Sequence, residues 1–102
     1  MLDLAKSAVA VIVDVLEKYV PDYEARAFGS RVNGAAREFA DLDLVLFGRE
    51  KLDWRRLEEL KDAFSESDLP IIVDILDWHA LSDQFREIIQ ERYEVLRRPT
   101  NH

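Results

Sequence analysis

Residues 41–47 constrain the fold of this chain more than any other segment. Three leucines alternate with other residues there, which places them on one face of a predicted β-strand. The other face begins with two carboxylates, Asp41 and Asp43. Because a strand with a leucine face needs neighbouring strands and a covering layer, the chain has to build a layered structure that contains a sheet.

The other segments supply the strands and helices for such a structure. Apolar periodicity, caps and prolines predict helices over residues 4–19, 53–64 and 82–96, a short helical turn over 30–36, and further strands over 23–28 and 71–76. Asp53 and Ser82 are the predicted N-caps of the second and third long helices. We therefore expect an α/β (α+β) fold with a small mixed three-stranded sheet and flanking helices, built as a single domain over residues 1–102.

The composition excludes several classes of protein. Without cysteine the chain has no disulfide, thiolate nucleophile or cysteine-based zinc site, and its two histidines exclude a histidine-rich metal site. The net charge of −7, without a basic stripe, argues against direct binding of nucleic acid. The apolar run over residues 8–13 is far shorter than a membrane span and lacks the features of a signal peptide. We therefore expect a cytoplasmic protein that does not bind membranes.

A candidate phosphate-binding turn follows the first predicted strand. Gly29 permits a tight turn, Ser30 offers a hydroxyl group and the start of a helix, and Arg31 adds a cation. A Gly-Ser pair is also an ordinary helix cap, and the motif alone does not separate the two interpretations. Gly29, Ser30 and Arg31 are therefore candidate nucleotide-binding residues.

Asp41 and Asp43 are candidate metal ligands. Residues two apart on a strand share a face, so the two carboxylates repel each other unless water or a cation separates them. Magnesium is the natural cation, because it takes hard oxygen ligands and leaves positions for substrate phosphates. The alternative is a solvated strand face that begins with acidic residues.

A third candidate ligand is Asp74, which lies inside the apolar segment 71–76. A buried carboxylate at this position needs a partner or a metal ion, and a strand beside residues 41–47 would bring it to the same site. Asp77 competes with Asp74. The alternation, however, places Asp77 on the opposite face at the strand end, where a carboxylate more often faces solvent or caps the next turn. We therefore favour Asp74.

Taken together, these motifs resemble those of a known family. The sequence reads FGSRVNG over residues 28–34, DLDLV over 41–45 and IVDIL over 72–76. The Gly-Ser pair, the Asp-x-Asp strand and the later carboxylate strand are similar to the signature of nucleotidyltransferases related to DNA polymerase beta. The first two runs resemble the minimal nucleotidyltransferase (MNT) branch of that family. The resemblance extends over most of the chain, to about residue 89.

The resemblance implies a nucleotidyltransferase core and an enzyme that transfers AMP from ATP to a hydroxyl group. It implies that Asp41, Asp43 and Asp74 are catalytic and hold Mg²⁺ in a two-metal site, and that residues 29–31 hold the phosphates. Members of this branch pair with helical HEPN-domain toxins. The resemblance therefore also implies an antitoxin that adenylylates a tyrosine of its HEPN partner.

Two alternative functions fit the same residues. The chain could silence its partner by contact alone, with a vestigial site, or it could modify a small-molecule hydroxyl. We also expect an apolar surface for a partner, because a small core does not readily cover Trp54, Trp78, Phe85 and Tyr93. Such a surface would support a homo-oligomer or a hetero-oligomer.

Overall fold

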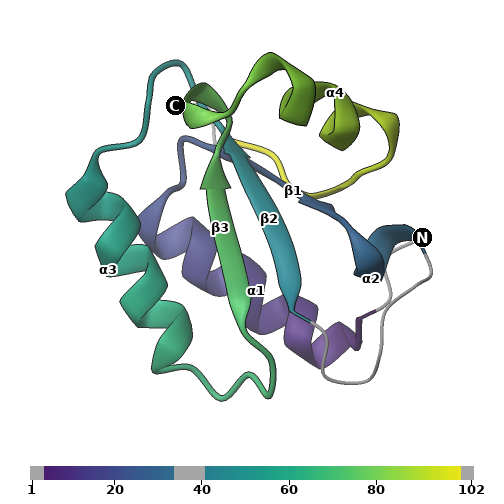
Figure 1. Cartoon of the computed structure of the whole chain (residues 1–102). Helices are drawn as coiled ribbons and strands as arrows, with labels where there is room; N and C mark the ends of the chain where they lie inside the picture. Colours follow the sequence, from purple (N-terminus) through teal and green to yellow (C-terminus); the bar gives the residue numbers. More distant parts are fainter. Residues whose placement is uncertain (1–3, 34–40, 100–102) are drawn as a thin grey trace.

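Strands and helices alternate along most of the chain in the computed structural model, which describes residues 4–33 and 41–99 (Figure 1). Within these residues the elements are α1 (Lys6–Tyr19), β1 (Glu24–Phe28), α2 (Ser30–Asn33), β2 (Leu42–Phe47), α3 (Trp54–Ser65), β3 (Val73–Asp77), the 3-10 turn η1 (Trp78–Ala80), α4 (Asp83–Glu91) and β4 (Glu94–Arg97). The described strands form a mixed sheet in the order β3-β2-β1-β4, with β2 and β3 parallel and the other neighbours antiparallel. The predicted fold class, with a mixed sheet and flanking helices, is confirmed.

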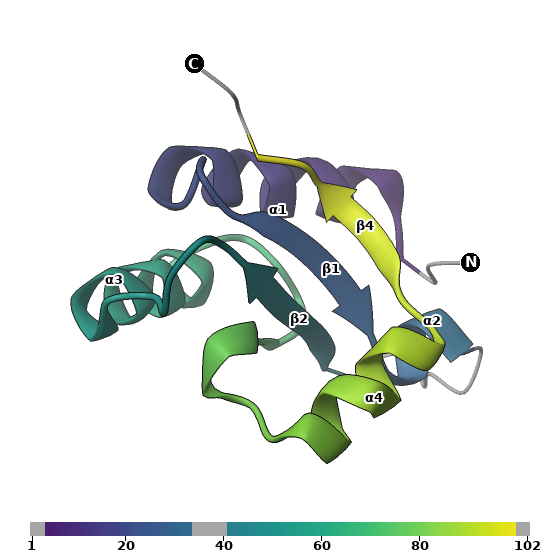
Figure 2. The same ribbon diagram turned by 90° about the horizontal axis from the view of Figure 1, so that it is seen from above.

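Helices α1 and α3 cover one face of the sheet, and α4 lies on the other (Figure 2). The leucines of β2 (Leu42, Leu44 and Leu46) point into the layer beneath α1 and α3 and are fully buried. Their neighbours in this core include Ile12 and Leu16 of α1 and Leu60 and Phe64 of α3. The leucine face predicted from the alternation is therefore the core face of the sheet, and its burial drives folding.

The second face of the sheet is covered over only part of its area. Phe28 of β1, Val45 of β2 and Ile89 of α4 form a small buried cluster there. Asp43 lies on the same face as Val45, two residues earlier, and is half-buried. The N-terminal end of β2 projects beyond the cover of α4 (Figure 1). Asp43, at this end, also lines an open cleft.

The last predicted helix, over residues 82–96, is too long. α4 ends at Glu91, and the residues that follow leave the helix to pair with β1 as strand β4, so the sheet has a fourth strand where we predicted three. Without β4, the backbone groups along one edge of β1 would have no partner. Arg97 fixes the additional strand, because its guanidinium donates to the carbonyl oxygens of Pro21 (3.0 Å) and Tyr23 (3.4 Å).

The remaining boundaries differ little from the prediction. Asp53 and Ser82 cap α3 and α4 as predicted, each accepting a hydrogen bond from a backbone N–H of the first turn. β3 begins later than predicted, at Val73, which is in register with the first residue of β2, Leu42. The short helix starts at Ser30, and its predicted end lies outside the described residues. None of the described helices is long and apolar enough to cross a membrane.

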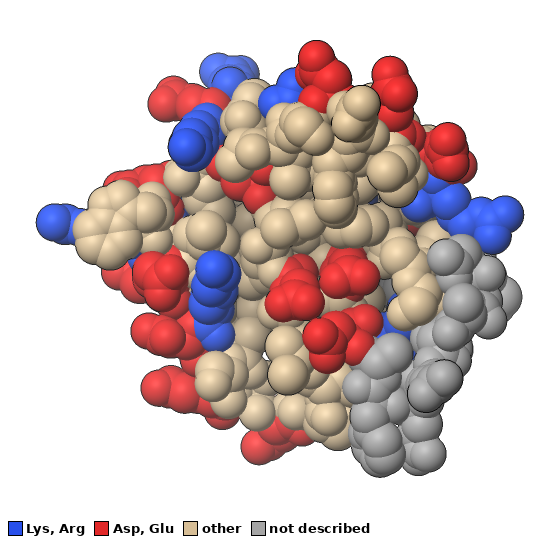
Figure 3. Space-filling model, in the orientation of Figure 1, with Lys and Arg blue, Asp and Glu red and all other residues tan. Residues whose placement is uncertain are grey.

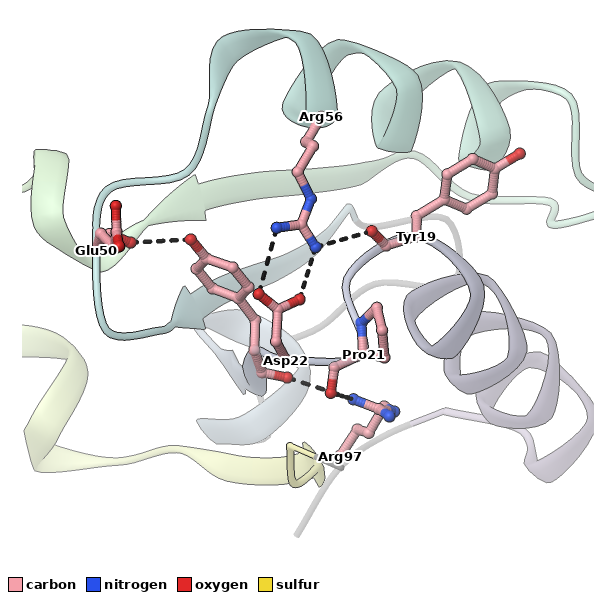
Figure 4. A network of polar contacts seen from close by, with 7 residues as sticks. Tyr19, Pro21, Asp22, Glu50, Arg56 and Arg97 are labelled. Atoms are coloured by element: carbon pink, nitrogen blue, oxygen red, sulfur yellow. Dashed lines mark hydrogen bonds and ion pairs between the residues drawn. The ribbon is translucent and has the colours of Figure 1, made fainter. Parts of the chain in front are cut away.

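A polar network holds the end of the sheet at which β1 begins (Figure 4). The guanidinium of Arg56 in α3 donates to both carboxylate oxygens of Asp22 (2.6 and 3.3 Å) and to the carbonyl oxygen of Tyr19 (3.1 Å). The hydroxyl of Tyr23 donates to the carbonyl oxygen of Glu50 (2.9 Å). These contacts tie the turn after α1 to α3 and to the loop after β2.

Candidate functional site

The turn between β1 and α2 packs directly against a carboxylate of β2. Gly29 has a φ of +82°, in the left-handed region that favours glycine, and α2 starts at the next residue, Ser30. A Cβ atom added at Gly29 would lie 2.5 Å from Oδ2 of Asp43, which is closer than two such atoms can approach. Glycine at this position therefore permits the turn and also brings the backbone of Gly29 next to the carboxylate.

Asp43 and Asp74 lie side by side on one face of the sheet. They occupy partner positions in the parallel pairing of β2 with β3, and partner positions on neighbouring strands share a face. On the other side, the partner of Asp43 in β1 is Phe28, which leads directly into Gly29. The sheet thus places the candidate phosphate turn, Asp43 and Asp74 in one row across β1, β2 and β3.

Asp77 lies on the opposite face and has a structural role. It is in register with Leu46, and only 6% of its surface is exposed. Its carboxylate accepts hydrogen bonds from the backbone N–H groups of Leu52 (2.7 Å) and His79 (3.1 Å). Asp77 thereby caps η1 and anchors the loop before α3. The hydrogen bonds of Asp77 are made within the chain, whereas Asp74 faces solvent.

The carboxylates of Asp41, Asp43 and Asp74 give the site its negative charge. Among residues 4–33 and 41–99, no Lys or Arg side chain forms an ion pair with Asp41, Asp43 or Asp74. Burial raises the pKa of Asp43 above its usual value, and the charges of Asp74 and Asp41 raise it further. Figure 3 shows acidic side chains gathered near the start of β2. Such a group favours the binding of a cation.

An open cleft of about 910 Å³ leads to Asp43 and Asp74. Apolar side chains of β1, β3 and α4 contribute to its walls, among them Phe28, Leu76 and Phe85. Apolar walls with a few convergent polar groups are the usual form of a small-molecule site. The two carboxylates can therefore meet a ligand without rearrangement of the sheet.

The donor set of this site fits magnesium. Carboxylate oxygens are the hard ligands that Mg²⁺ prefers, and the charges of Asp74 and Asp41 act together on Asp43. Within the described residues, no group of three or more Asp, Glu, His or Cys side chains is close enough to enclose a metal ion. In nucleotide sites, however, Mg²⁺ is usually held by one or two carboxylates together with substrate phosphates and water. The pair of Asp43 and Asp74, with Asp41 just before β2, meets this requirement.

The surroundings of one predicted site residue, Asp74, differ from the prediction. Asp74 is exposed and not buried, because β3 is an edge strand and the described helices leave this part of its outer face open. Arg31 exposes only 6% of its surface and makes an interaction of its own, so it is not a free surface cation. Gly29 and Ser30 are half-buried, and they form the accessible part of the predicted phosphate turn. Asp41 is exposed.

The predicted exposure of aromatic residues is right for three of the four positions. Trp54, Phe85 and Tyr93 expose 68%, 38% and 38% of their surface. Trp78 is half-buried, because its ring stacks on that of Phe47 with the centroids 4.4 Å apart. The protein therefore presents aromatic side chains to solvent, as expected for a chain with a partner.

Two further apolar residues are exposed beside the site and were not predicted. Ile72 exposes 65% of its surface and Ile88 exposes 62%. The alternation offered a signal for Ile72, since it lies two residues before Asp74 and shares its face. For Ile88 the sequence offered no signal, because its exposure depends on where α4 crosses the sheet.

Comparison with known proteins identifies the family. The family model of polymerase beta nucleotidyltransferases matches residues 11–100. The chain is also 48% identical over 95 residues to the probable protein adenylyltransferase MntA of Haemophilus influenzae. That match covers 93% of this chain and 83% of the relative.

Solved structures share the fold at lower sequence identity. A toxin–antitoxin complex with AMP-PNP matches with a TM-score of 0.67 and 21% identity, over 90% of this chain and 73% of that one. The complex of a tri-AMPylated HEPN toxin with its MNT antitoxin from Shewanella oneidensis matches with a TM-score of 0.62 and 18% identity, over 93% and 72% of the two chains. These two matches show the fold alone. With the family match and the close relative, they lead to one conclusion: this chain belongs to the polymerase beta nucleotidyltransferase family, in its minimal, MntA-like branch.

Proposed function

We propose that this chain is a Mg²⁺-dependent nucleotidyltransferase that moves AMP from ATP to a tyrosine of a HEPN-domain toxin, and that it acts in the cytoplasm as the antitoxin of that pair. The relative from Haemophilus influenzae bears the name of a protein adenylyltransferase, and one structural neighbour is a complex with a tri-AMPylated HEPN toxin. The observation that carries the proposal is the row of Gly29, Asp43 and Asp74 at an open cleft.

The turn after β1 binds the phosphates of ATP in this proposal. Gly29 and Ser30 offer backbone N–H groups and a hydroxyl at the edge of the site, where a triphosphate would reach Asp43. Arg31, the next residue of the turn, is buried and adds positive charge. The close contact of Gly29 with Asp43 keeps the phosphates and the carboxylates within reach of a shared cation.

Asp41, Asp43 and Asp74 are the residues that would hold one or two Mg²⁺ ions. Bound Mg²⁺ supplies neutralising charge for the phosphates and favours ionisation of the acceptor hydroxyl. Asp74 ends the row on the side away from Gly29, where it orients the acceptor and accepts its proton. A tyrosine needs this help, because its hydroxyl has a pKa of about 10 in water.

The transfer exchanges one bond at the α-phosphorus of ATP. The acceptor oxygen forms a bond to this phosphorus, and the bond from the phosphorus to the oxygen that bridges to the β-phosphate breaks. Pyrophosphate leaves with that oxygen, while the acceptor proton passes to Asp74 and then to solvent. The product is a tyrosine ester of AMP, which adds bulk and negative charge to the toxin. The net charge of −7 disfavours a polyanion such as RNA as the acceptor.

Mass spectrometry of a co-expressed HEPN partner tests this function. We expect an added AMP on a tyrosine with the wild-type chain, and its loss with Asp41→Asn and with Asp43→Asn. Asp62→Asn is the matched control, because Asp62 is an exposed carboxylate on α3 outside the site, and it should leave the modification unchanged. An unmodified partner in the wild-type sample would refute the proposal.

A contact-only antitoxin is the second candidate, and the exposed side chains of Ile72 and Ile88 favour it. The same experiment separates the two functions. If the Asp41→Asn, Asp43→Asn double variant still neutralises the toxin in cells, contact alone is sufficient. If neutralisation disappears together with AMP, the chemistry is required. Labelled AMP that appears on a small molecule and not on the partner would support the third function, modification of a small-molecule hydroxyl.

A further inference from the structure

We propose that the free edge of β3 is the docking site of the acceptor protein, which adds an extended segment as a further strand and so carries its hydroxyl to Asp74. This inference rests on the proposed function for the identity of the acceptor. It goes beyond that function by naming the surface, the conformation of the bound segment and its side-chain pattern.

The hydrogen bonding of β3 leaves one row of backbone groups unused. The N–H of Leu42 in β2 donates to the carbonyl oxygen of Ile72 (2.9 Å), so the backbone groups of Ile72 and Asp74 point toward β2. Those of Val73 and Ile75 alternate with them and point away from the sheet. β3 is an outer strand of the sheet, and within the described residues nothing bonds to these outward groups. An exposed edge of this kind is a template for an additional strand.

The cleft that leads to the site also contains this edge. Its lining includes Lys61 and Phe64 of α3 on one side of β3, and Asp74 and Phe85 on the other, with Ile75 between them. The cleft therefore follows the strand and is not confined to the catalytic face. An extended peptide can lie along it and place alternate side chains on the two sides.

An added strand would put the acceptor in line with the site. Neighbouring strands lie roughly 4.8 Å apart, and partner residues share a face. A residue paired with Asp74 on the added strand therefore continues the row that runs from Asp43 to Asp74. Its side chain approaches from the side opposite Gly29, where the phosphates bind in the proposed function. The acceptor hydroxyl then lies beside Asp74 and faces the α-phosphate of the bound ATP.

The surroundings of Asp74 predict the sequence of the docked segment. Ile72 and Leu76 flank Asp74 at two residues on either side and share its face, and Ile72 is 65% exposed. Apolar side chains two positions from the acceptor residue would cover them. The carboxylate of Asp74 and the net charge of −7 disfavour acidic residues near the hydroxyl and favour Lys or Arg. The segment is therefore extended and basic, with apolar residues around a hydroxyl.

The same charges argue against a second copy of this chain on this edge. An antiparallel pairing of β3 with β3 centred on Asp74 would bring the Asp74 carboxylates of two copies together across the new ladder, and like charges in such positions are destabilising. Each copy also carries a net charge of −7. A basic segment of a different protein is the complementary occupant.

Four variants test the free edge of β3, and all four are expected to keep Mg–ATP binding. Val73→Pro removes an outward N–H and is compatible with an edge strand, whereas Val73→Thr keeps both the N–H and the branched shape. Ile72→Gln removes the apolar contact, and Trp54→Gln is its control, since Trp54 is 68% exposed on a different element. The readouts are the second-order rate of AMP transfer from labelled ATP to the HEPN acceptor, and the affinity for Mg–ATP by calorimetry.

We expect Val73→Pro and Ile72→Gln to lower the transfer rate at least about fivefold, as the loss of one hydrogen bond or one apolar contact would, with ATP affinity within about twofold of wild type. The two controls should stay within about twofold on both measures. Wild-type rates in Val73→Pro and Ile72→Gln would overturn the docking site. If Val73→Pro fails to fold, the transfer rate of Ile72→Gln still tests the docking site.

Amide hydrogen exchange tests the docking independently of catalysis. Saturation with the acceptor should slow exchange of the Val73 and Ile75 amides at least about tenfold. Protection confined to α4 would overturn the proposal. Slower exchange as the chain alone is concentrated would assign the edge to a second copy instead. If wild type transfers no AMP, the proposed function fails, and protection of these two amides still reports on docking.

Discussion

At the end of the sheet where β1 begins, the carboxylates have partners. Asp22 holds the guanidinium of Arg56, and Asp77 accepts two backbone N–H groups. At the other end, within the described residues, Asp41, Asp43 and Asp74 have no ion-pair partner. One group of carboxylates therefore stabilises the fold, while the other remains available to a ligand. The difference separates a closed end of the sheet, which holds Asp22 and Asp77, from an open end, which holds Asp41, Asp43 and Asp74.

The largest expected effect comes from the same substitution at two positions of β3. Asp77→Ala leaves the buried N–H of Leu52 and the N–H of His79 without an acceptor, and should lower the free energy of unfolding by about 3 kcal/mol. Asp74→Ala changes an exposed side chain and should alter it by less than about 0.5 kcal/mol. Urea unfolding measures both variants. Equal losses would remove the structural distinction between the two carboxylates.

A smaller effect of opposite sign is expected at the open end. The pKa of Asp43 is raised by burial and by the charges of Asp74 and Asp41. The stability that the protonated carboxyl of Asp43 contributes is therefore fully present below about pH 3.8, and it is lost as the pH rises through the folded-state pKa. At pH 7 without divalent ions, Asp43→Asn should therefore raise Tm by roughly 2–4 °C. The gain should vanish near pH 3. A lower Tm for the variant at pH 7 would show that Asp43 is satisfied within the chain.

The smallest effect concerns the ion pair at the closed end. The hydrogen bond from Arg56 lowers the pKa of Asp22, so the stability that this pair contributes is present above about pH 3.8 and is lost as the pH falls through the lowered pKa. The Asp22 side chain is 59% exposed, and solvent screening limits the contribution to about 0.5 kcal/mol. Asp22→Asn should therefore lower the free energy of unfolding by about this amount at pH 6 and low salt. The same loss in 1 M NaCl would contradict an electrostatic origin.

The local sequence pattern was sufficient to predict those features of the molecule that depend on residues close together in the chain. The alternation in β2 predicted the buried face of Leu42, Leu44 and Leu46, which the structure confirms. The same parity separated Asp74 from Asp77 before their partners were known. The caps of α3 and α4 were predictable for the same reason, since a cap depends on residues within one turn.

Features that depend on distant segments were not predictable in this way. Residues 94–97 have the composition to extend α4, and only the free edge of β1 makes them a strand. Asp74 looked buried because its neighbours in sequence are apolar, yet its exposure depends on its place in an edge strand. The burial of Arg31 had no signal in the local pattern.

The parallel pairing of β2 with β3 has a consequence for the order in which the site forms during synthesis. Asp43 and Asp74 are partners in space, but α3 and its two loops separate them in the chain, so a loop of roughly 30 residues must close before they meet. When the ribosome has released residues only as far as the end of α3, the nascent chain contains Gly29, Ser30 and Asp43 but lacks the strand that carries Asp74. In the proposed function, transfer activity therefore has to wait until β3 has been made and has docked.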